Sequence, residues 1–310
     1  MKLLLRVHQP GMLTTVQRLA RPGRERYGVA AGGAMDMVSL RLANALARNP
    51  PDTPALEITL TGPALEVLAH GLFAIAGADI PLTVDGRAVD NWHSFTAGPG
   101  SIIAFGRRRH GARAYLAIHG GFDTTTAGSL KRDQIVSGGA TSSPRLPLIH
   151  LAASAAPNYA STPTLRVTKG PHWDRLSTSG RDTFLTREFK ATLDSSRAGI
   201  RLGGTVLEFV EGASADIISE PTPLGTIQLP ASGNPIILMA DRPTTGGYAK
   251  IATVIAVDIP LAAQLAPGDP VRFEVITLEE AHKALARREA ELRLIERIAT
   301  WMKSSGPVCR

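Results

Sequence analysis

The sequence predicts a mainly β protein of the α+β type, built as two lobes and ending in a helix. Three observations support this prediction. Short apolar runs rich in β-branched residues recur along the 310 residues, and Gly, Pro and polar residues separate them at short intervals. Only two segments carry long helical periodicity. One small, polar, proline-flanked stretch near the middle of the chain is typical of a linker.

Expected strands dominate the first half of the chain. Asp85-Gly86 between apolar runs predicts a tight hairpin, because this pair readily adopts the positive φ angles of such turns. The basic run Arg107-Arg108-Arg109-His110, followed by Gly111, is expected at the tip of a second hairpin. The expected strands of this half are residues 3–7, 55–61, 64–69, 73–77, 82–84, 101–105 and 113–118.

Two helices are expected. Asp36 is placed to cap the first, which runs to about Arg48 and is stopped by the prolines that follow. Thr277 and Glu280 form a capping box at the start of the second, which runs to about Lys303. Apolar residues recur every three or four positions along this terminal helix, so it is expected to pack on its own lobe or to dock a partner protein.

The linker, residues 151–163, sets the expected domains. Residues 1–157 form an N-terminal β lobe with one helix, residues 164–276 a C-terminal β lobe, and residues 277–303 the terminal helix. The expected strands of the second lobe are residues 165–169, 216–219, 226–229, 236–240, 251–257 and 271–276.

Composition narrows the class of protein. No apolar run approaches the roughly 20 residues that a membrane span needs, and the apolar start of the chain is broken too early for a signal peptide. We therefore expect a cytoplasmic protein. The single cysteine, Cys309, excludes an intrachain disulfide. The net charge of +7 comes with few aromatic residues, and the eight histidines show no metal-ligand spacing, so neither a nucleic-acid partner nor a metal site is expected.

The segment from Ala240 to Lys250 is the strongest candidate for a ligand site. It crowds a carboxylate, a guanidinium, hydroxyls, a phenol and an ammonium around Gly246-Gly247, between two expected core strands. A glycine pair permits positive φ, and successive N–H groups in such a turn can bind an anion. The alternative is a tight turn in which Asp241 pairs with Arg242, but the density of different functional groups favours a ligand site.

Three further clusters repeat this pattern. The loop from Gly28 to Asp36 runs into a helix start, which attracts anions, although capping by Asp36 alone explains it. Around residues 219–230, Glu220 and Gln228 flank a proline-rigid turn, and a buried Gln228 would need a partner. Arg197 and Arg201 lie four residues apart, which on a strand puts both on one face. They could bind a carboxylate or phosphate, or form surface salt bridges.

In this order the motifs resemble the family named for allophanate hydrolase subunit 2. It includes the carboxyltransferase module of urea carboxylase, the sporulation-kinase regulator KipA and the C subunit of bacterial 5-oxoprolinase. The resemblance runs from about Val7 to Leu278. It is carried by residues 13–17 and 21–23, Gly33-Ala34-Met35-Asp36, Arg41-Leu42-Ala43-Asn44, Leu56-Glu57-Ile58-Thr59, Gly77-Ala78-Asp79, residues 113–117, and residues 241–253.

The resemblance implies cyclophilin-like β barrels in the two lobes and a partner, the homologue of allophanate hydrolase subunit 1, which is KipI-like and forms the B subunit of 5-oxoprolinase. It implies a component of an ATP-dependent enzyme, using ATP with Mg, that opens the lactam 5-oxoproline to glutamate. One alternative is a carboxyltransferase that acts on urea or a similar amide with biotin. Another is a regulatory binding protein of the KipA type, because the family's usual acid and phenol are missing between Ser195 and Leu202.

In such an enzyme the residues of the polar loops would have different roles in the reaction of a planar amide. Asp241 or Asp36 would act as acid or base, and Lys250 would bind anionic groups with Arg242 and Arg197. The remaining expected substrate contacts are Gln228 and Tyr248 for the amide, Glu220 as a carboxylate, and Thr244, Thr245, Gly246 and Gly247 as backbone donors.

Overall fold

The computed structural model describes residues 2–124, 128–140, 147–159 and 162–304. Cys309 and residues 160–161 of the expected linker lie outside this part of the chain. The chain divides into two compact units. Unit 1 contains Met1–Leu19, Asp36–Asn158 and Glu289–Arg310, and unit 2 contains Ala20–Met35 and Tyr159–Arg288. The segment Ala20–Met35 therefore belongs with unit 2, although we expected it in the first lobe.

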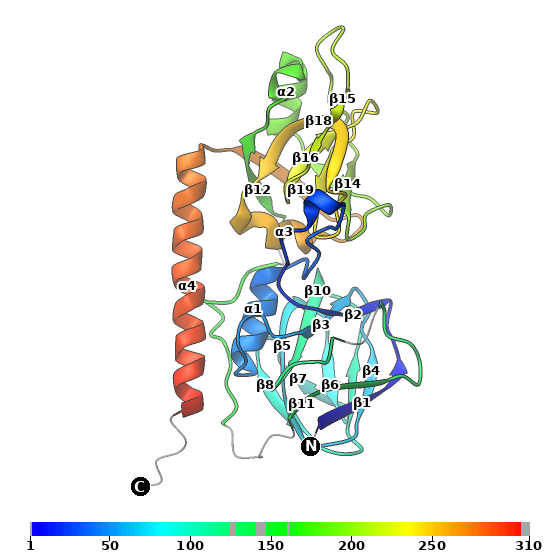
Figure 1. Ribbon diagram of the computed structural model, residues 1–310, viewed down its shortest axis with the longest axis vertical. Coiled ribbons are helices and arrows are strands. Elements are labelled where there is room, and N and C mark those ends of the chain that lie inside the picture. Colours follow the sequence, from blue (N-terminus) through cyan, green and yellow to red (C-terminus); the bar gives the residue numbers. More distant parts are fainter. Residues whose placement is uncertain (1, 125–127, 141–146, 160–161, 305–310) are drawn as a thin grey trace. The chain divides into compact units, whose positions relative to one another are not determined.

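Unit 1 is built from two β-sheets that share one apolar core (Figure 1). The six-stranded sheet has the order β11-β1-β4-β9-β6-β7, and the five-stranded sheet has the order β2-β3-β10-β5-β8. Its strands are β1 (Lys2–Gln9), β2 (Leu13–Gln17), β3 (Ala55–Thr59), β4 (Ala64–Val67), β5 (Gly71–Asp79), β6 (Leu82–Val84), β7 (Arg87–Val89), β8 (Ser94–Ala97), β9 (Ile102–Phe105), β10 (His110–Ile118) and β11 (Ile135–Ala140).

Helix α1 (Met37–Leu46) packs against β5 and β10. It starts where the capping signal predicted, because the side chain of Asp36 accepts hydrogen bonds from the Ser39 amide, at 2.8 Å, and from the Ser39 hydroxyl, at 2.6 Å. The Asp36 amide donates to the Tyr115 hydroxyl, which in turn donates to Glu57. Burial, together with the Glu57 carboxylate, raises the pKa of Tyr115 well above its usual value.

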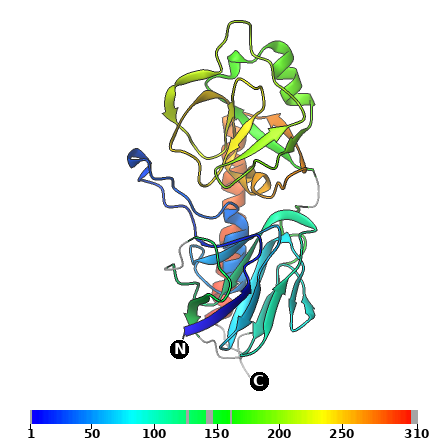
Figure 2. The same cartoon turned by 90° about the vertical axis from the view of Figure 1, so that its right-hand side faces the viewer.

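Unit 2 is a closed barrel. Seven strands follow each other in the order β12-β19-β13-β14-β17-β16-β18, and β12 also pairs with β18, which closes the ring; β15 is added at β18. Figure 2 shows these strands curving around a common centre. The strands are β12 (Thr164–Lys169), β13 (Phe189–Ala191), β14 (Gly199–Gly203), β15 (Asp216–Pro221), β16 (Thr226–Leu229), β17 (Ile236–Leu238), β18 (Thr245–Val254) and β19 (Pro270–Val275).

Short helices and one long helix complete the structure. The long helix α4 begins at Leu278 as the capping box predicted, since Thr277 and Glu280 exchange hydrogen bonds. No helix in the described part of the chain is both long and apolar enough to cross a membrane. The helices are η1 (Glu25–Tyr27), η2 (Trp173–Arg175), α2 (Thr178–Thr186), η3 (Ala256–Asp258), α3 (Ile259–Ala263) and α4 (Leu278–Ser304).

The mainly β prediction, with two lobes and a C-terminal helix, is confirmed, and two local predictions are wrong. Arg107–His110 does not form a hairpin tip, because β9 pairs with β4 and β6 while β10 pairs with β3 and β5 in the other sheet. The run connects the two sheets instead. The polar loop of residues 240–250 is also mostly strand, since β18 already starts at Thr245.

Candidate functional site

The outer face of the unit 2 barrel carries a row of chemically active side chains. Residues directly opposite on antiparallel strands project to the same side of a sheet. Here Arg201 of β14 lies opposite Ile236 of β17, Ile236 opposite Gln228 of β16, and Gln228 opposite Lys250 of β18. Their chain neighbours Ile200, Ile237, Ile227, Leu229 and Ile251 belong to the barrel core and Ala249 is buried, so the row lies on the other face of the sheet, with a register shift between Ile227 and Gln228.

Lys250 and Glu220 form an ion pair at one end of this row. The Lys250 Nζ lies 2.8 Å from the Glu220 Oε2, and only 6% of the lysine side chain is exposed against 48% of the glutamate. Hydrogen bonding from Lys250 and its charge lower the pKa of Glu220. A buried ammonium with a single, half-exposed carboxylate partner is well suited to receive a second anionic group.

Gln228 supplies an orphan donor beside that pair. Its residue is 4% exposed, and its Nε2 is buried and has no hydrogen-bond partner among the residues that the structure describes. The amide lies against Gly246, because a Cβ built on that glycine would be 2.3 Å from the Nε2 and 3.0 Å from the Cγ2 of Thr222. A buried N–H without a partner costs free energy, so it is a position where a ligand oxygen would stabilise the protein.

His172 orders the backbone of the same strand. The Lys250 amide donates to the His172 Nδ1 at 3.1 Å, and the His172 amide donates to the Lys250 carbonyl at 3.1 Å. Burial, and then the charge of Arg175, lower the pKa of His172. The imidazole is therefore held neutral, as its acceptor role at Nδ1 requires. Sequence reasoning missed His172, whose place after β12 gave no signal of this contact.

Arg242 and Thr222 hold the turn before β18. The Arg242 Nε donates to the Thr222 carbonyl at 2.6 Å, the Thr222 hydroxyl donates to the Pro243 carbonyl, and the Thr222 amide donates to the Thr244 carbonyl. Burial lowers the pKa of Arg242. The structure thus gives Arg242 a bracing role in the turn, and the Thr244 carbonyl accepts a hydrogen bond there.

The glycine pair does not form the expected anion-binding turn. Gly246 and Gly247 lie in β18, neither has a positive φ, and Gly246 pairs with Glu220 of β15 in the ladder. Thr245 is exposed at the start of the same strand, opposite Pro221. Gly246 serves close approach of the Gln228 amide rather than backbone binding of a ligand.

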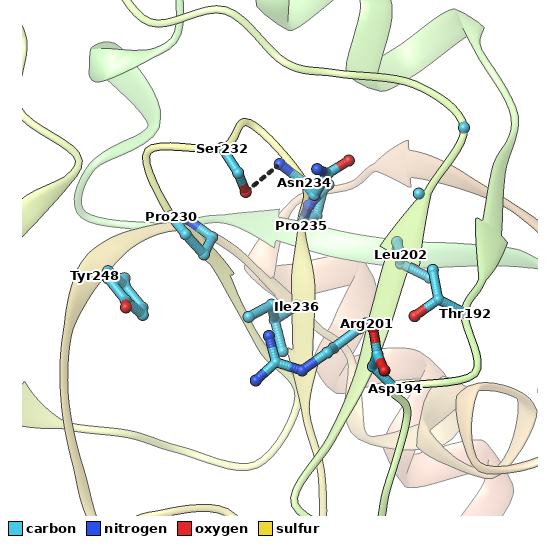
Figure 3. A pocket seen from close by; sticks show the side chains of 12 residues that line it. Thr192, Asp194, Arg201, Leu202, Pro230, Ser232, Asn234, Pro235, Ile236 and Tyr248 are labelled. Carbon is cyan, nitrogen blue, oxygen red and sulfur yellow. Dashed lines mark hydrogen bonds between the residues drawn. The ribbon is translucent and has the colours of Figure 1, made fainter.

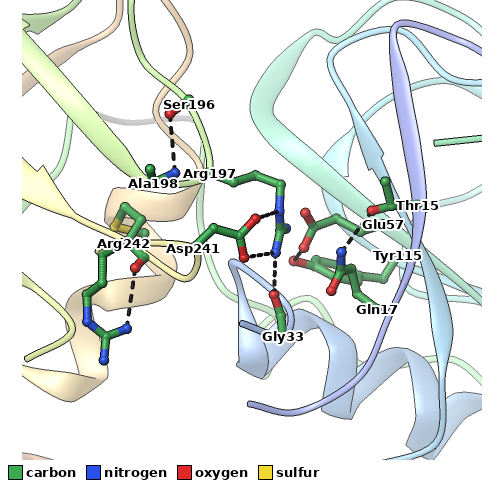
Figure 4. Close-up of polar contacts among 11 residues, drawn as sticks. Thr15, Gln17, Gly33, Glu57, Tyr115, Ser196, Arg197, Ala198, Asp241 and Arg242 are labelled. Atoms are coloured by element: carbon green, nitrogen blue, oxygen red, sulfur yellow. Dashed lines mark hydrogen bonds and ion pairs between the residues drawn. The ribbon is translucent and has the colours of Figure 1, made fainter. Parts of the chain in front are cut away.

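Arg197 and Asp241 form a second polar group within unit 2, shown at the centre of Figure 4. Two guanidinium nitrogens of Arg197 lie 2.8 and 3.0 Å from the two Asp241 carboxylate oxygens, and one of them donates to the Gly33 carbonyl at 2.6 Å. Met35 is buried in the barrel core. The pair therefore anchors the segment Ala20–Met35 to unit 2.

Three expectations about these residues need correction. Asp241 pairs with Arg197, whereas the alternative to a ligand site had paired it with Arg242. Arg197 precedes β14 while Arg201 lies within it, so the two arginines do not share one face of a strand. Asp36 has no exposed surface and caps α1, which accounts for its place at the helix start. We therefore leave Asp36 out of the site, in spite of its predicted role as acid or base.

A cavity of about 520 Å³ opens on the barrel at the other end of the row (Figure 3). Tyr248 and Pro230 stand on one side of it and Thr192 and Asp194 on the other, and the Arg201 side chain extends next to Ile236 between them. Tyr248, which lies between Gly246 and Lys250 on β18, thus lines this cavity. In the described part of the chain no three His, Cys, Asp or Glu residues cluster as metal ligands would.

Comparisons with known proteins agree with this architecture. The family model described as "Carboxyltransferase domain, subdomain A and B" matches residues 27–275. The chain belongs to this carboxyltransferase-domain family. It is 33% identical to the C subunit of 5-oxoprolinase from Escherichia coli over 96% of this chain and 98% of that protein. It is 30% identical to the Haemophilus influenzae protein of the same name, over 92% and 95% of the two chains.

The same fold occurs as part of a much larger enzyme. The crystal structure of the K. lactis urea amidolyase superposes with a TM-score of 0.86 at 26% identity, covering 94% of this chain and 20% of that one. The expected resemblance to the family of the 5-oxoprolinase C subunit and urea carboxylase is confirmed.

Proposed function

We propose that this chain is the C subunit of an ATP-dependent 5-oxoprolinase-like amidohydrolase, acting with a KipI-like partner of the B type. Its similarity to two proteins that carry the name of the 5-oxoprolinase C subunit, over nearly their whole length, supports this proposal. The structural observation that carries it is the buried, unpartnered Gln228 Nε2 beside the Lys250–Glu220 pair.

A lactam matches these groups. Its carbonyl oxygen accepts hydrogen bonds and its ring N–H donates one, so the oxygen would accept from the Gln228 Nε2 while the Glu220 carboxylate accepts from the N–H. The Lys250 ammonium would lie beside negative charge that develops on the lactam oxygen. This assigns the amide-orienting role to Gln228, as expected from the sequence, and the electrostatic role to Lys250.

The reaction opens the ring between the carbonyl carbon and the nitrogen. Oxygen from water forms the new C–O bond, the C–N bond breaks, and the nitrogen takes up protons to give the amine of glutamate. A lactam is a poor electrophile, so ATP would phosphorylate its oxygen with release of ADP. The acyl phosphate left after the C–N bond breaks would then be hydrolysed by a second water to the carboxylate and inorganic phosphate. In this scheme Lys250 favours the charged oxygen, and Gln228 holds the amide plane in place.

Reconstitution of the complete set of subunits tests the proposal. The chain, its KipI-like partner and the remaining component are mixed, and formation of glutamate and ADP from 5-oxoproline and ATP is followed. We expect turnover that Gln228→Leu reduces by about 2- to 12-fold and Lys250→Met by at least about tenfold, the sizes expected for loss of one hydrogen bond from a neutral group and from a charged group. Arg272→Ala, on the exposed outer face of β19, is the matched control. Absence of turnover with all subunits present would refute the proposal.

A second candidate is carboxyl transfer from biotin to urea or a similar amide. The TM-score of 0.86 with the K. lactis urea amidolyase supports it, and both substrates contain a planar amide. A biotin carrier would have to come from another protein. Carboxylation of urea by the reconstituted enzyme, without release of glutamate from 5-oxoproline, would favour this candidate. If the Lys250→Met variant still bound its KipI-like partner protein, a regulatory protein of the KipA type would be favoured.

A further inference from the structure

Two oppositely charged side chains line the cavity of Figure 3 without forming an ion pair with each other. Arg201 and Asp194 both line it and both are exposed, yet within the described residues neither side chain has an ion-pair partner. The two belong to neighbouring segments, because the Thr192 amide donates to the Arg201 carbonyl at 2.8 Å. Opposite charges that line one cavity without pairing favour a ligand that carries both charges itself.

A threonine hydroxyl lies beside these charges. Thr192 lines the same cavity, and its buried Oγ1 has no hydrogen-bond partner in the described part of the chain. A hydroxyl oxygen can accept a hydrogen bond from an ammonium group, as a carboxylate does. Thr192 and Asp194 together therefore offer acceptors for a cation, next to the guanidinium of Arg201, which suits a carboxylate.

Apolar groups form another part of the lining. Tyr248, Pro230 and Ile236 belong to it, and Tyr248 is 42% exposed. Asn234 adds one amide at the rim (Figure 3). A ligand with a charged head at Arg201 and Asp194 would thus place an aliphatic side chain against this wall, with a polar end near Asn234.

We propose that this cavity binds a free α-amino acid through its zwitterionic head, with L-glutamate as the ligand. The α-carboxylate binds Arg201, the α-ammonium binds Asp194 and Thr192, and the side-chain methylenes lie on Ile236. The zwitterion follows from the cavity itself, whereas the choice of glutamate rests on the proposed function, whose product it is. The site lies on the same outer face as Gln228 and Lys250, two strands away from Gln228, so a bound product would lie close to the lactam site.

Calorimetric titration of the purified full-length chain, without ATP or partner proteins, tests this inference. L-glutamate is compared with glutarate, which has the same carbon chain and carboxylates but no ammonium. We expect glutarate to bind at least tenfold more weakly. Asp194→Asn should remove this discrimination, and Arg201→Gln should weaken both ligands.

Two exposed residues of the same unit serve as controls. Asp182→Asn in α2 and Lys190→Gln in β13 remove one charge of each sign outside the cavity, and both variants should bind L-glutamate as the unchanged chain does. Equal binding of glutarate and L-glutamate, or no binding of L-glutamate at millimolar concentration, would overturn the inference. Because binding is measured on the chain alone, failure of 5-oxoproline hydrolysis leaves this result unaffected.

Discussion

A methyl group added at Gly246 tests whether the Gln228 amide orients the substrate. In Gly246→Ala the new Cβ would lie 2.3 Å from the Gln228 Nε2, whereas ordinary contacts between heavy atoms are about 3.5 Å, so the amide must move by roughly 1 Å. A shift of that size breaks a hydrogen bond to a bound carbonyl. The loss of one such bond, about 0.5–1.5 kcal/mol, corresponds to a decrease of about 2- to 12-fold in kcat/KM.

Gly247→Ala is the matched control on the same strand. Its new Cβ would meet no atom closer than 3.5 Å, that of the Ile217 carbonyl oxygen, so kcat/KM should change less than about twofold. Neither glycine has a positive φ, and both variants should fold, because the clash at Gly246 involves the flexible end of a side chain and a methyl of Thr222.

The assay is ATP-dependent release of glutamate from 5-oxoproline by the reconstituted enzyme, with thermal unfolding of each variant measured beside it. The double variant of Gly246→Ala and Gln228→Leu tests the mechanism directly. Because the added methyl group acts only through the Gln228 amide, Gly246→Ala should not change kcat/KM further when Gln228 is already replaced by leucine. Equal kcat/KM for the two alanine variants, or an undiminished effect of Gly246→Ala when Gln228 is already replaced, would refute the reasoning.

Three other outcomes are expected. Arg197→Lys loses one of the two hydrogen bonds to Asp241 and should raise the rate of trypsin cleavage within Ala20–Met35 several-fold. Arg201→Lys should leave this rate unchanged. Equal cleavage rates in the two variants would contradict the anchoring role of Arg197. Arg41 contacts Glu289 and Glu296 of α4 at 2.7 Å each, and its side chain is 14% exposed. Arg41→Met should therefore lower the free energy of unfolding by about 2 kcal/mol and speed hydrogen exchange in residues 289–301, whereas Arg6→Met, at an exposed pair, should not. Unchanged exchange in Arg41→Met would exclude this contact as a tether of α4. The pKa of His172 is lowered in the folded chain, so the unfolded chain binds the proton more readily. Urea stability should therefore fall as pH drops below the unfolded value of about 6.5 and level off beneath the folded pKa, and His172→Asn should lose less stability between pH 7.5 and 5.5; equal losses would exclude His172 as the cause.

Much of the fold could be predicted from local sequence signals. The strand of residues 226–229 and the hairpin at Asp85-Gly86 were predicted with their observed bounds, and both helix caps form as expected, at Asp36 and at Thr277. Each of these features depends on side chains within a few residues of one another. The predicted hairpin at Arg107–His110 failed because the partners of a strand are chosen by distant chain segments.

The sequence predicted which residues could take part in the candidate site, but not which of them lie next to one another. Lys250, Glu220 and Gln228 were each expected from the sequence, and the structure brings them together through the β15–β18 and β16–β18 pairings. Arg197 and Arg201 were expected on one face, and they separate because β14 begins between them. Asp194 and Thr192 carried no signal, since an isolated acid and hydroxyl in a loop are ordinary surface residues.

By itself the sequence determined the β character of the chain, its two capped helices, its family and the functional groups that it can offer to an amide. These properties reside in residue types and short-range spacing. Only the tertiary structure decided that the Gln228 Nε2 has no hydrogen-bond partner among the described residues, that Gly246 leaves room for its amide, and that Arg201 and Asp194 line one cavity. The reason is physical: closure of the barrel sets strand register, and register, not distance along the chain, determines which side chains share a face and which polar atoms are cut off from water.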